Sequence, residues 1–330
     1  FQAPWRARYG IASVVALLLL MALALLRRRI KMEYVAWRIS HGVLASLAML
    51  LVMVHAYMVG RYIGTPLKQA LWLIYGAICV FLVAYLRVYK PWRMLKRPYR
   101  IAEVRAERGA VWSLALEPVG HAGLRFEPGQ FAWLTARHSP FAAHEHPFSF
   151  SSSSEQRDQI EFAIKELGDF TATIKDLPPG QHVYLDGPYG SFRPERYRDV
   201  DSYVLLAGGV GIAPMMSILR SMADHGETRP VLLLYGSQDW EGASFREELT
   251  ALEQRLNLKV VHVLERPPKD WQGEQGYITR EMLARYLPSD GTRFRVFICG
   301  PTGMLTAMER ALEALGVAPR MIHMERFDLA

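Results

Sequence analysis

Cysteine is scarce in this 330-residue sequence, which contains only Cys79 and Cys299. Two cysteines so far apart exclude a disulfide framework and a cysteine-based zinc site. Internal repeats and low-complexity segments are also missing, and no charged N-terminal region with a cleavage site indicates a signal peptide. Because the sequence starts at Phe1 rather than at a methionine, close to a hydrophobic run, we expect it to be a fragment of a longer protein.

Charged residues are rare in three hydrophobic stretches, at about 9–26, 37–60 and 67–89. Each has about the ~20 residues that a helix needs to cross a bilayer, so we predict three transmembrane helices. The net charge is +7, and much of the excess lies beside these stretches, which favours a role in topology over nucleic-acid binding. The connection 27–38 carries five Lys or Arg against two in 61–68. The positive-inside rule therefore places that connection, and everything after the third helix, in the cytoplasm.

Two histidines, His41 and His55, lie fourteen residues apart within the second hydrophobic stretch. Fourteen helical residues span roughly 21 Å and return to within about 40° of the same face. A histidine inside a membrane either hydrogen-bonds a neighbouring helix or serves a function. We interpret the pair as ligands of two stacked haem irons, with His41 near the cytoplasmic face and His55 near the outer face.

The remaining chain predicts two further domains. After a basic linker that contains Pro91 and Pro98, short alternating segments at 99–105, 111–117, 130–135, 159–165 and 182–186 predict an antiparallel β-barrel. Beyond residue 200, apolar strands at 203–207, 231–235, 259–264 and 295–298 alternate with helices, as in a parallel sheet. We therefore predict a multidomain chain, with a helical transmembrane bundle at 1–96, an antiparallel barrel at 97–196 and an α/β domain with a parallel sheet at 197–330.

Two motifs in the predicted barrel suit a flavin. In His146-Pro147-Phe148-Ser149, the serine offers a hydroxyl to the flavin ring and the phenylalanine offers an apolar face. In Gly168-Asp169-Phe170-Thr171, the threonine is predicted to cap a short helix whose free N–H groups suit a pyrophosphate. Lys165, at the end of the preceding strand, would add a positive charge. Each motif alone also fits an ordinary turn.

Two motifs in the α/β domain suit a nucleotide. Gly208-Gly209-Val210-Gly211-Ile212-Ala213-Pro214 follows an apolar strand and opens a helix, which we expect to start at Pro214. Its glycines let the backbone approach a pyrophosphate closely, although the usual dinucleotide fingerprint has glycine or alanine where Pro214 stands. Cys299-Gly300-Pro301 ends another strand, where ligands of such sheets bind. Cys299 is otherwise a small buried core residue.

In this order, the motifs resemble those of the membrane ferric reductase and NADPH oxidase family, from about residue 9 to the C-terminus. Glu325-Arg326-Phe327 is similar to that family's terminal motif, whose aromatic ring covers the flavin. The resemblance implies ferredoxin-reductase-type FAD and NAD(P) domains, two b-type haems, and catalytic roles for Ser149, Cys299, Glu325 and Phe327. It also implies that each haem takes one histidine from each of two helices, so that the partners of His41 and His55 lie upstream of Phe1.

The nucleotide preference stays open at this stage. Where NADPH-preferring members of that family carry an arginine, this sequence has Gln238 and Asp239. Asp239 would repel a 2′-phosphate and bind a free ribose hydroxyl, whereas Arg246 follows within a few residues. We therefore write the electron donor as NAD(P)H.

The main hypothesis is a multi-pass oxidoreductase of a bacterial inner membrane, with its FAD and NAD(P) domains in the cytoplasm. Electrons would pass from NAD(P)H through FAD and two haems to a ferric chelate, dioxygen or a protein acceptor on the outer face. One alternative is a membrane-anchored NAD(P)H:flavin oxidoreductase without haem, which passes electrons to a protein partner. Another is a membrane scaffold that binds nucleotide without turnover. We expect no nucleic-acid partner.

Overall fold

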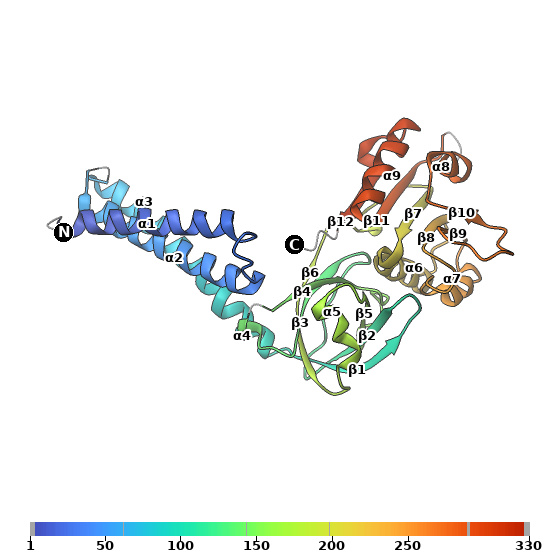
Figure 1. Cartoon of the computed structure of the whole chain (residues 1–330), viewed down its shortest axis with the longest axis horizontal. Helices are drawn as coiled ribbons and strands as arrows, with labels where there is room; N and C mark the ends of the chain where they lie inside the picture. Colours follow the sequence, from blue (N-terminus) through green and yellow to red (C-terminus); the bar gives the residue numbers. More distant parts are fainter. Residues whose placement is uncertain (1–3, 62, 143, 198, 289–290, 327–330) are drawn as a thin grey trace. The chain divides into compact units, whose positions relative to one another are not determined.

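Two compact units make up the chain in the computed structural model, which describes residues 4–61, 63–142, 144–197, 199–288 and 291–326 (Figure 1). The first unit comprises Phe1–Lys96 and His138–Glu145, and the second comprises Arg97–Arg137 and His146–Ala330. The first is built mainly from helices. The second contains two six-stranded sheets.

Three long apolar helices dominate the first unit: α1 (Trp5–Leu26), α2 (Tyr34–Val59) and α3 (Pro66–Ala84). Gly60, with a φ of +67°, ends α2, and Thr65 caps α3 by accepting a hydrogen bond from the Lys68 amide. The third helix continues through a π-helical turn, Tyr85–Tyr89, into α4 (Lys90–Leu95). All three helices are long and apolar enough to cross a membrane, with mean hydropathy between 2.1 and 2.6. The positions predicted from the hydrophobic stretches agree with them.

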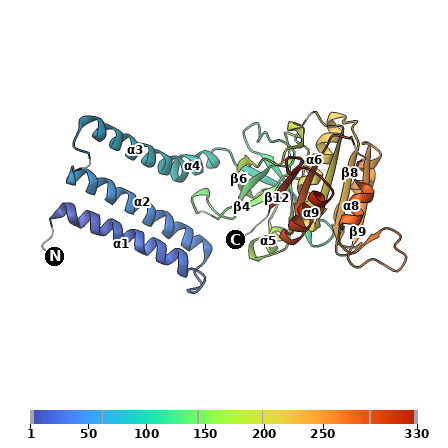
Figure 2. The ribbon, with the colours of Figure 1, turned by 90° about the horizontal axis from the view of Figure 1, so that it is seen from above.

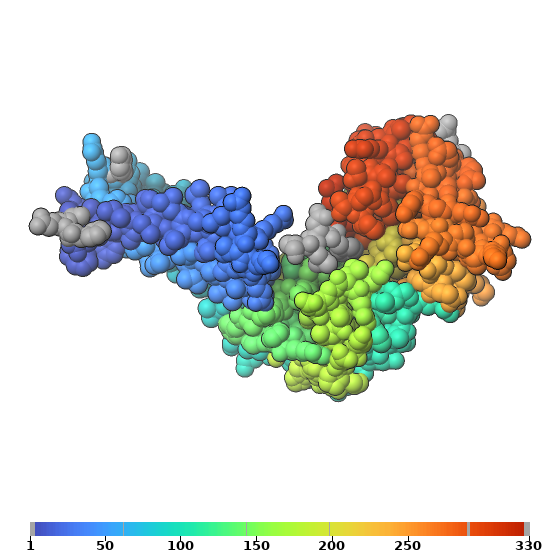
Figure 3. All heavy atoms as spheres, in the orientation of Figure 1, coloured from blue at the N-terminus to red at the C-terminus, as the bar shows by residue number. Residues whose placement is uncertain are grey.

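Helices α1 and α2 lie side by side and pack through small residues (Figure 2). Ser13 and Ala16 of α1 and Ala48 of α2 are buried, and the Ser13 hydroxyl donates to the Ala48 carbonyl oxygen at 3.1 Å. Small side chains allow the close backbone approach that is common between membrane helices. The large apolar side chains of α1 (dark blue in Figure 3) point outward instead. Such a surface suits contact with lipid chains.

The antiparallel sheet of the second unit has the strand order β4-β3-β6-β1-β2-β5. Its strands are β1 (Tyr99–Ala106), β2 (Val111–Pro118), β3 (Phe131–Ala136), β4 (His146–Ser149), β5 (Ile160–Lys165) and β6 (His182–Tyr189). Phe150, just after β4, forms an antiparallel bridge to Phe162 of β5, so the two ends of the sheet meet. These two rings and Phe126 lie in its core. The antiparallel sheet expected from the alternating pattern is therefore confirmed.

The second sheet is parallel throughout, with the order β10-β9-β8-β7-β11-β12. Its strands are β7 (Ser202–Gly208), β8 (Val231–Ser237), β9 (Leu258–Leu264), β10 (Glu274–Gln275), β11 (Phe294–Gly300) and β12 (Ile322–Arg326). Helices α6 (Ile212–His225) and α7 (Arg246–Glu253) cover one face, and α8 (Arg280–Tyr286) and α9 (Thr302–Ala314) cover the other. The order runs outward from β7 in one direction and from β11 in the other. Ligands of such sheets bind at this reversal, beyond the carboxyl ends of the strands.

The parallel sheet was predicted, but β10 and β12 were not. β10 has only two residues, and β12 is an edge strand whose sequence Ile-His-Met-Glu-Arg lacks an apolar run. The helix α6 begins at Ile212, not at Pro214 as expected, and Pro214 is buried within its first turn. The domain boundaries at residues 96 and 196 stay a prediction.

Candidate functional site

Two glycine-containing turns meet at the carboxyl ends of the neighbouring strands β7 and β11. Gly208 ends β7, and a short turn through Gly211 leads into α6. A Cβ on Gly211 would lie 2.1 Å from the Cys299 carbonyl oxygen, and a Cβ on Gly208 would lie 2.4 Å from the Met304 sulfur. Close packing against the backbone of β11 therefore requires glycine at position 211, whereas a Cβ at position 208 would displace mainly the flexible end of the Met304 side chain. The glycines of the turn expose backbone that a ligand can approach closely.

A cavity of about 280 Å³ opens beside these turns. Its lining comes from β4, from β5 with the loop that follows, and from the two glycine turns. The lining residues are Pro147, Phe148, Ser149, Ala163, Ile164, Lys165, Leu167, Thr171, Gly208, Gly209, Val210, Gly211, Ala213, Gly300 and Pro301. The structure thus brings together most of the residues that the sequence proposed for flavin and nucleotide. His146, Gly168, Asp169 and Pro214 are not part of this lining.

Ser149 carries the most informative polar atom of the cavity. The residue is 4% exposed, and its Oγ has no hydrogen-bond partner among the residues that the structure describes. Buried hydroxyls are normally paired, because leaving one unpaired costs about 1–3 kcal/mol. A flavin edge offers the acceptor that this hydroxyl lacks, and the surrounding cavity is largely apolar. The residues present therefore fit a flavin.

The loop after β5 differs in detail from the prediction. The helix begins at Asp169 and spans only Asp169–Ala172, so Thr171 is not its cap. The Thr171 hydroxyl instead accepts hydrogen bonds from the amides of Leu167 and Gly168, both at 2.9 Å. His146 stacks on Phe170, with ring centroids 3.8 Å apart. Both contacts shape the loop around the cavity, and the predicted phosphate contacts of Gly168, Asp169 and Thr171 stay a prediction.

A second cavity, of about 690 Å³, continues from the same turns toward the ends of β8 and β9. It is lined by Lys165, Gly208, Gly209, Gly236, Ser237, Gln238, Glu265, Gly276, Tyr277, Ile278, Pro301, Gly303, Met304, Ala307 and Met308. Lys165 borders both cavities and supplies a positive charge where they adjoin. An elongated site with a cation at its middle suits a dinucleotide whose pyrophosphate lies near the glycine turns.

An acidic residue, Glu265, lines the second cavity. Gln238 also lines it, and its contact with the nucleotide stays a prediction. Glu265 was not predicted from the sequence. Asp239 is not part of the lining: its carboxylate accepts a hydrogen bond from the Gly242 amide at 2.8 Å and lies 3.3 Å from an Arg266 nitrogen. Arg246 also faces elsewhere, since it donates to the Trp240 carbonyl oxygen at 2.7 Å. Glu265 directly follows β9. The rule that ligands bind at the carboxyl ends of strands could therefore have identified it from the sequence.

Cys299 and Glu325 are neighbours across β11 and β12. Cys299 is fully buried, and burial, together with the charge of Glu325, raises the pKa of its thiol well above the ordinary value. Burial also raises the pKa of Glu325 to about 7. The thiol is therefore protonated and does not act as a thiolate. Their catalytic roles stay a prediction, and Phe327 lies outside the described residues.

In the helical unit, His41 and His55 both belong to α2, as predicted. The His55 Nδ1 lies 2.5 Å from the Arg6 carbonyl oxygen, and a Cβ on Gly10 would lie 2.8 Å from the His55 ring. His55 therefore packs against α1. The His41 ring packs on Trp37, with centroids 5.1 Å apart, and its Nδ1 is buried with no partner among the described residues. The sequence up to residue 96 contains no other histidine, and the described residues hold no cluster of three or more metal-ligating side chains.

An antiparallel barrel, a parallel sheet and a cavity between a buried serine and two glycine turns are together typical of flavin-dependent reductases with two domains. Family comparison agrees: residues 99–193 match an FAD-binding domain and residues 205–310 match an oxidoreductase NAD-binding domain. The chain therefore carries an FAD-binding domain and an oxidoreductase NAD-binding domain. Neither match covers the helices, so the expected ferric reductase transmembrane domain and its haems gain no support from them.

Individual relatives share the reductase part. The chain is 31% identical over 237 residues to the reductase component of propane 2-monooxygenase from Rhodococcus jostii, covering 69% of this chain and 62% of that protein. It is 31% identical over 173 residues to NADH-cytochrome b5 reductase 1 of Pyricularia oryzae, covering 50% and 55%. The chain thus spans little more than half the length of these relatives. Among solved structures, the CS-b5R domains of human Ncb5or in the NAD+ form are 26% identical, with a TM-score of 0.59 over 69% of this chain and 68% of that one.

Proposed function

We propose that this chain is a membrane-anchored NAD(P)H:flavin oxidoreductase that passes electrons to a protein acceptor. The observation that carries the proposal is the cavity in which the unpaired Ser149 hydroxyl and the turns at Gly208 and Gly300 line the same space. It would bring a flavin and a nicotinamide together. The names of the relatives support a protein acceptor, because they describe cytochrome b5 reductases and the reductase component of a monooxygenase.

Different residues would bind the flavin and the nucleotide. FAD, when bound, can accept a hydride and release electrons one at a time. Ser149 would donate a hydrogen bond to the flavin edge, and Phe148 would cover part of its apolar surface. The backbone at Gly208, Gly209 and Gly211 and the Lys165 ammonium would hold the negative pyrophosphate of the nucleotide. Glu325, whose pKa of about 7 keeps it partly protonated at neutral pH, would hold a proton next to Cys299.

NADH is the donor that we propose. The far end of the second cavity presents the carboxylate of Glu265, and Tyr277 donates a hydrogen bond to that carboxylate at 3.3 Å. A carboxylate accepts hydrogen bonds from ribose hydroxyls and repels a 2′-phosphate. Arg246, the cation that would have favoured NADPH, is held against Trp240 by its hydrogen bond and by stacking at 4.5 Å.

The full chain, purified in detergent and supplied with FAD, tests the proposal. We expect NADH to reduce the bound flavin under anaerobic conditions, and a one-electron protein such as cytochrome b5 to reoxidise it. Flavin that binds but stays oxidised with both NADH and NADPH would contradict the enzyme function and favour the scaffold alternative. Reduction without electron transfer to any protein would contradict only the proposed acceptor.

A second candidate function is electron transfer across the membrane through haem, supported by the buried, unpaired Nδ1 of His41. The segment His138–Glu145 belongs to the helical unit and directly precedes β4, the strand that carries Ser149. Its Glu145 pairs with Arg38 of α2. Full-length protein from haem-replete cells should show a bis-histidine haem spectrum that His41→Ala abolishes. Haem-free full-length protein that still reduces soluble acceptors would exclude this route.

A further inference from the structure

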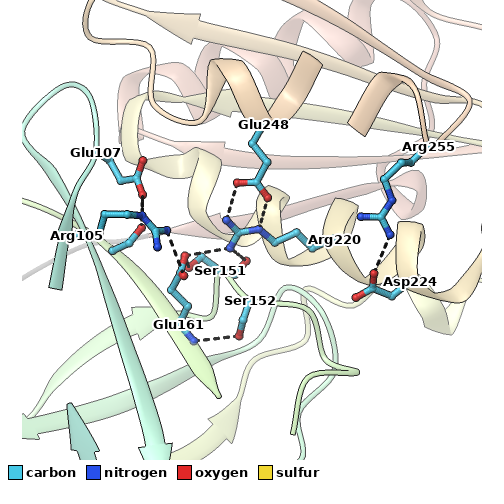
Figure 4. A network of polar contacts seen from close by, with 10 residues as sticks. Arg105, Glu107, Ser151, Ser152, Glu161, Arg220, Asp224, Glu248 and Arg255 are labelled. Atoms are coloured by element: carbon cyan, nitrogen blue, oxygen red, sulfur yellow. Dashed lines mark hydrogen bonds and ion pairs between the residues drawn. The ribbon is translucent and has the colours of Figure 1, made fainter. Parts of the chain in front are cut away.

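Arg220, a partly buried residue of α6, contacts both helix α7 and the turn that follows β4 (Figure 4). Arg220 donates from Nε and Nη2 to the two carboxylate oxygens of Glu248 on α7, each at 2.7 Å. Its Nη1 donates to the Ser151 carbonyl oxygen at 2.7 Å and to Glu161 of β5 at 3.1 Å. One guanidinium therefore holds three partners, two of them in the antiparallel barrel.

The turn Ser151–Ser154 is held from both of its sides. On the barrel side, the Ser151 amide donates to the Glu161 carbonyl oxygen at 2.8 Å, and the Glu161 amide donates to the Ser152 hydroxyl at 3.0 Å. On the side of α6, the Ser154 amide donates to the Ser221 hydroxyl at 2.9 Å. This turn begins two residues after Ser149. The turn is therefore the first segment after β4, the strand that carries Ser149.

Helix α6 connects this turn rigidly to the nucleotide motif. It begins at Ile212, directly after Gly211, and Arg220 lies about 12 Å further along at the ordinary helical rise. A shift of α6 at Arg220 would therefore also move the glycine turn. Arg220 thus links the turn after β4 to the helix that begins at the nucleotide motif.

Ion pairs with Glu248 and Glu161 orient the Arg220 guanidinium. Glu161 also pairs with Arg105 at 3.4 Å, and Arg105 pairs with Glu107 at 3.1 Å. Burial alone would lower the pKa of Arg220, but its hydrogen bonds and charge pairing with Glu248 and Glu161 raise it above the ordinary value. The guanidinium is thus always charged, and its planar fork matches the Glu248 carboxylate while one nitrogen remains for the barrel. A lysine ammonium cannot reproduce that arrangement.

We propose that Arg220 is a positioning residue for hydride transfer, which holds the Gly208–Gly211 turn at the distance from Ser149 that the reaction requires. The inference rests on the proposed NADH:flavin oxidoreductase function. In that reaction one hydrogen moves with its electron pair from the nicotinamide to the flavin, so the nicotinamide is oxidised as the flavin is reduced. A misplacement of about 1 Å between reactants can slow such a step about 100-fold.

Single-turnover reduction of bound FAD by NADH in the full chain tests this role. Arg220→Gln should slow flavin reduction about 10- to 100-fold, while the dissociation constants for NADH and FAD change little. Arg220→Lys should recover part of the rate, because it keeps the charge without the fork. Glu161→Gln removes the negative charge from one of the two barrel partners of Arg220 and leaves the Ser151 carbonyl oxygen in place. It should slow the step in the same direction by a smaller factor.

Arg255→Gln is the matched control. Arg255 also forms an ion pair with α6, through Asp224 at 3.0 Å, but the partners recorded for it do not include a barrel residue (Figure 4). This variant should reduce flavin at the wild-type rate. Hydrogen exchange in the FAD-free protein gives a readout independent of activity: the amides of Ser151 and Ser154 should exchange faster in Arg220→Gln and unchanged in Arg255→Gln.

Wild-type protein that fails to reduce FAD would contradict the proposed function itself. If the wild type is active, an unchanged rate in Arg220→Gln and Glu161→Gln would overturn the positioning role alone. An equal loss in the Arg220→Gln and Arg255→Gln variants would also overturn it, since both would then act only through the stability of α6. If Arg220→Gln does not fold, Arg220→Lys and Glu161→Gln decide the question by the same criteria.

Discussion

Replacing Ser149 by alanine should affect the FAD-free and the FAD-bound protein in opposite directions. In the described part of the chain its Oγ is buried without a partner, and such a hydroxyl costs about 1–3 kcal/mol. Alanine removes this cost and leaves a space of one oxygen atom, so we expect the FAD-free variant to gain about 1 kcal/mol. For a folded unit of this size, that gain raises Tm by roughly 2–4 °C.

With FAD bound, the same substitution removes a hydrogen bond. A neutral hydrogen bond contributes about 0.5–1.5 kcal/mol, and the FAD-free variant is also about 1 kcal/mol more stable. The affinity for FAD should therefore fall by about 1.5–2.5 kcal/mol, which is roughly 10- to 70-fold. Thermal unfolding of the FAD-free protein and fluorescence titration with FAD measure the two effects separately. A variant with unchanged FAD affinity would refute the contact between this hydroxyl and the flavin.

Ser217→Ala provides the control. The Ser217 hydroxyl on α6 is likewise buried with no partner recorded among the described residues, but it is not part of either cavity lining. Its removal should stabilise the protein by a similar amount and leave the affinity for FAD unchanged. Equal effects of both substitutions on FAD affinity would mean that packing, and not the Ser149 hydroxyl, determines flavin binding.

Three further predictions follow from the same region. Gly211→Ala places a Cβ 2.1 Å from the Cys299 carbonyl oxygen, so the turn must move. The affinity for NADH, measured by titration, should fall about tenfold or more while FAD stays bound. An unchanged affinity would argue against a nucleotide at this turn. Glu265→Gln removes a carboxylate from the second cavity and should raise kcat/KM for NADPH relative to NADH, and an unchanged ratio would exclude a role in donor choice. Burial raises the pKa of Glu325 to about 7, against about 4.3 in an unfolded chain, so the folded state binds this proton more tightly. The free energy of unfolding should therefore decrease as pH rises from about 4.3 to about 7, by less than about 3 kcal/mol because the side chain is only partly buried. Urea unfolding at several pH values should show that Glu325→Gln loses this dependence, and an unaltered dependence would assign it to another group.

The elements with strong periodic patterns were predictable from the sequence. The three long apolar helices follow from long uncharged stretches, and β7, β8, β9 and β11 follow from buried apolar runs. The motif residues Ser149, Lys165 and Gly208 lie around one cavity because each ends a strand or follows it directly. Strand β12 was not predicted because it lies at the edge of the sheet, where a strand can form without a run of buried apolar residues.

Contacts between distant segments were not predictable. Nothing in the sequence of α6 shows that Arg220 pairs with Glu248 of another helix and with Glu161 of the barrel, because each partner is an ordinary charged residue in its own segment. The Thr171 hydroxyl was expected to cap a helix, but the loop uses it to satisfy two backbone amides. The spacing of His41 and His55 places both on α2, yet the contact of His55 with α1 depends on packing that the spacing does not encode.

Anaerobic addition of NADH to the full chain reconstituted with FAD tests the central claim most directly. The account predicts that the absorbance of oxidised flavin disappears on addition of NADH, faster than with NADPH, and returns when a one-electron protein acceptor is added. Flavin that remains oxidised in the presence of both nucleotides would contradict it.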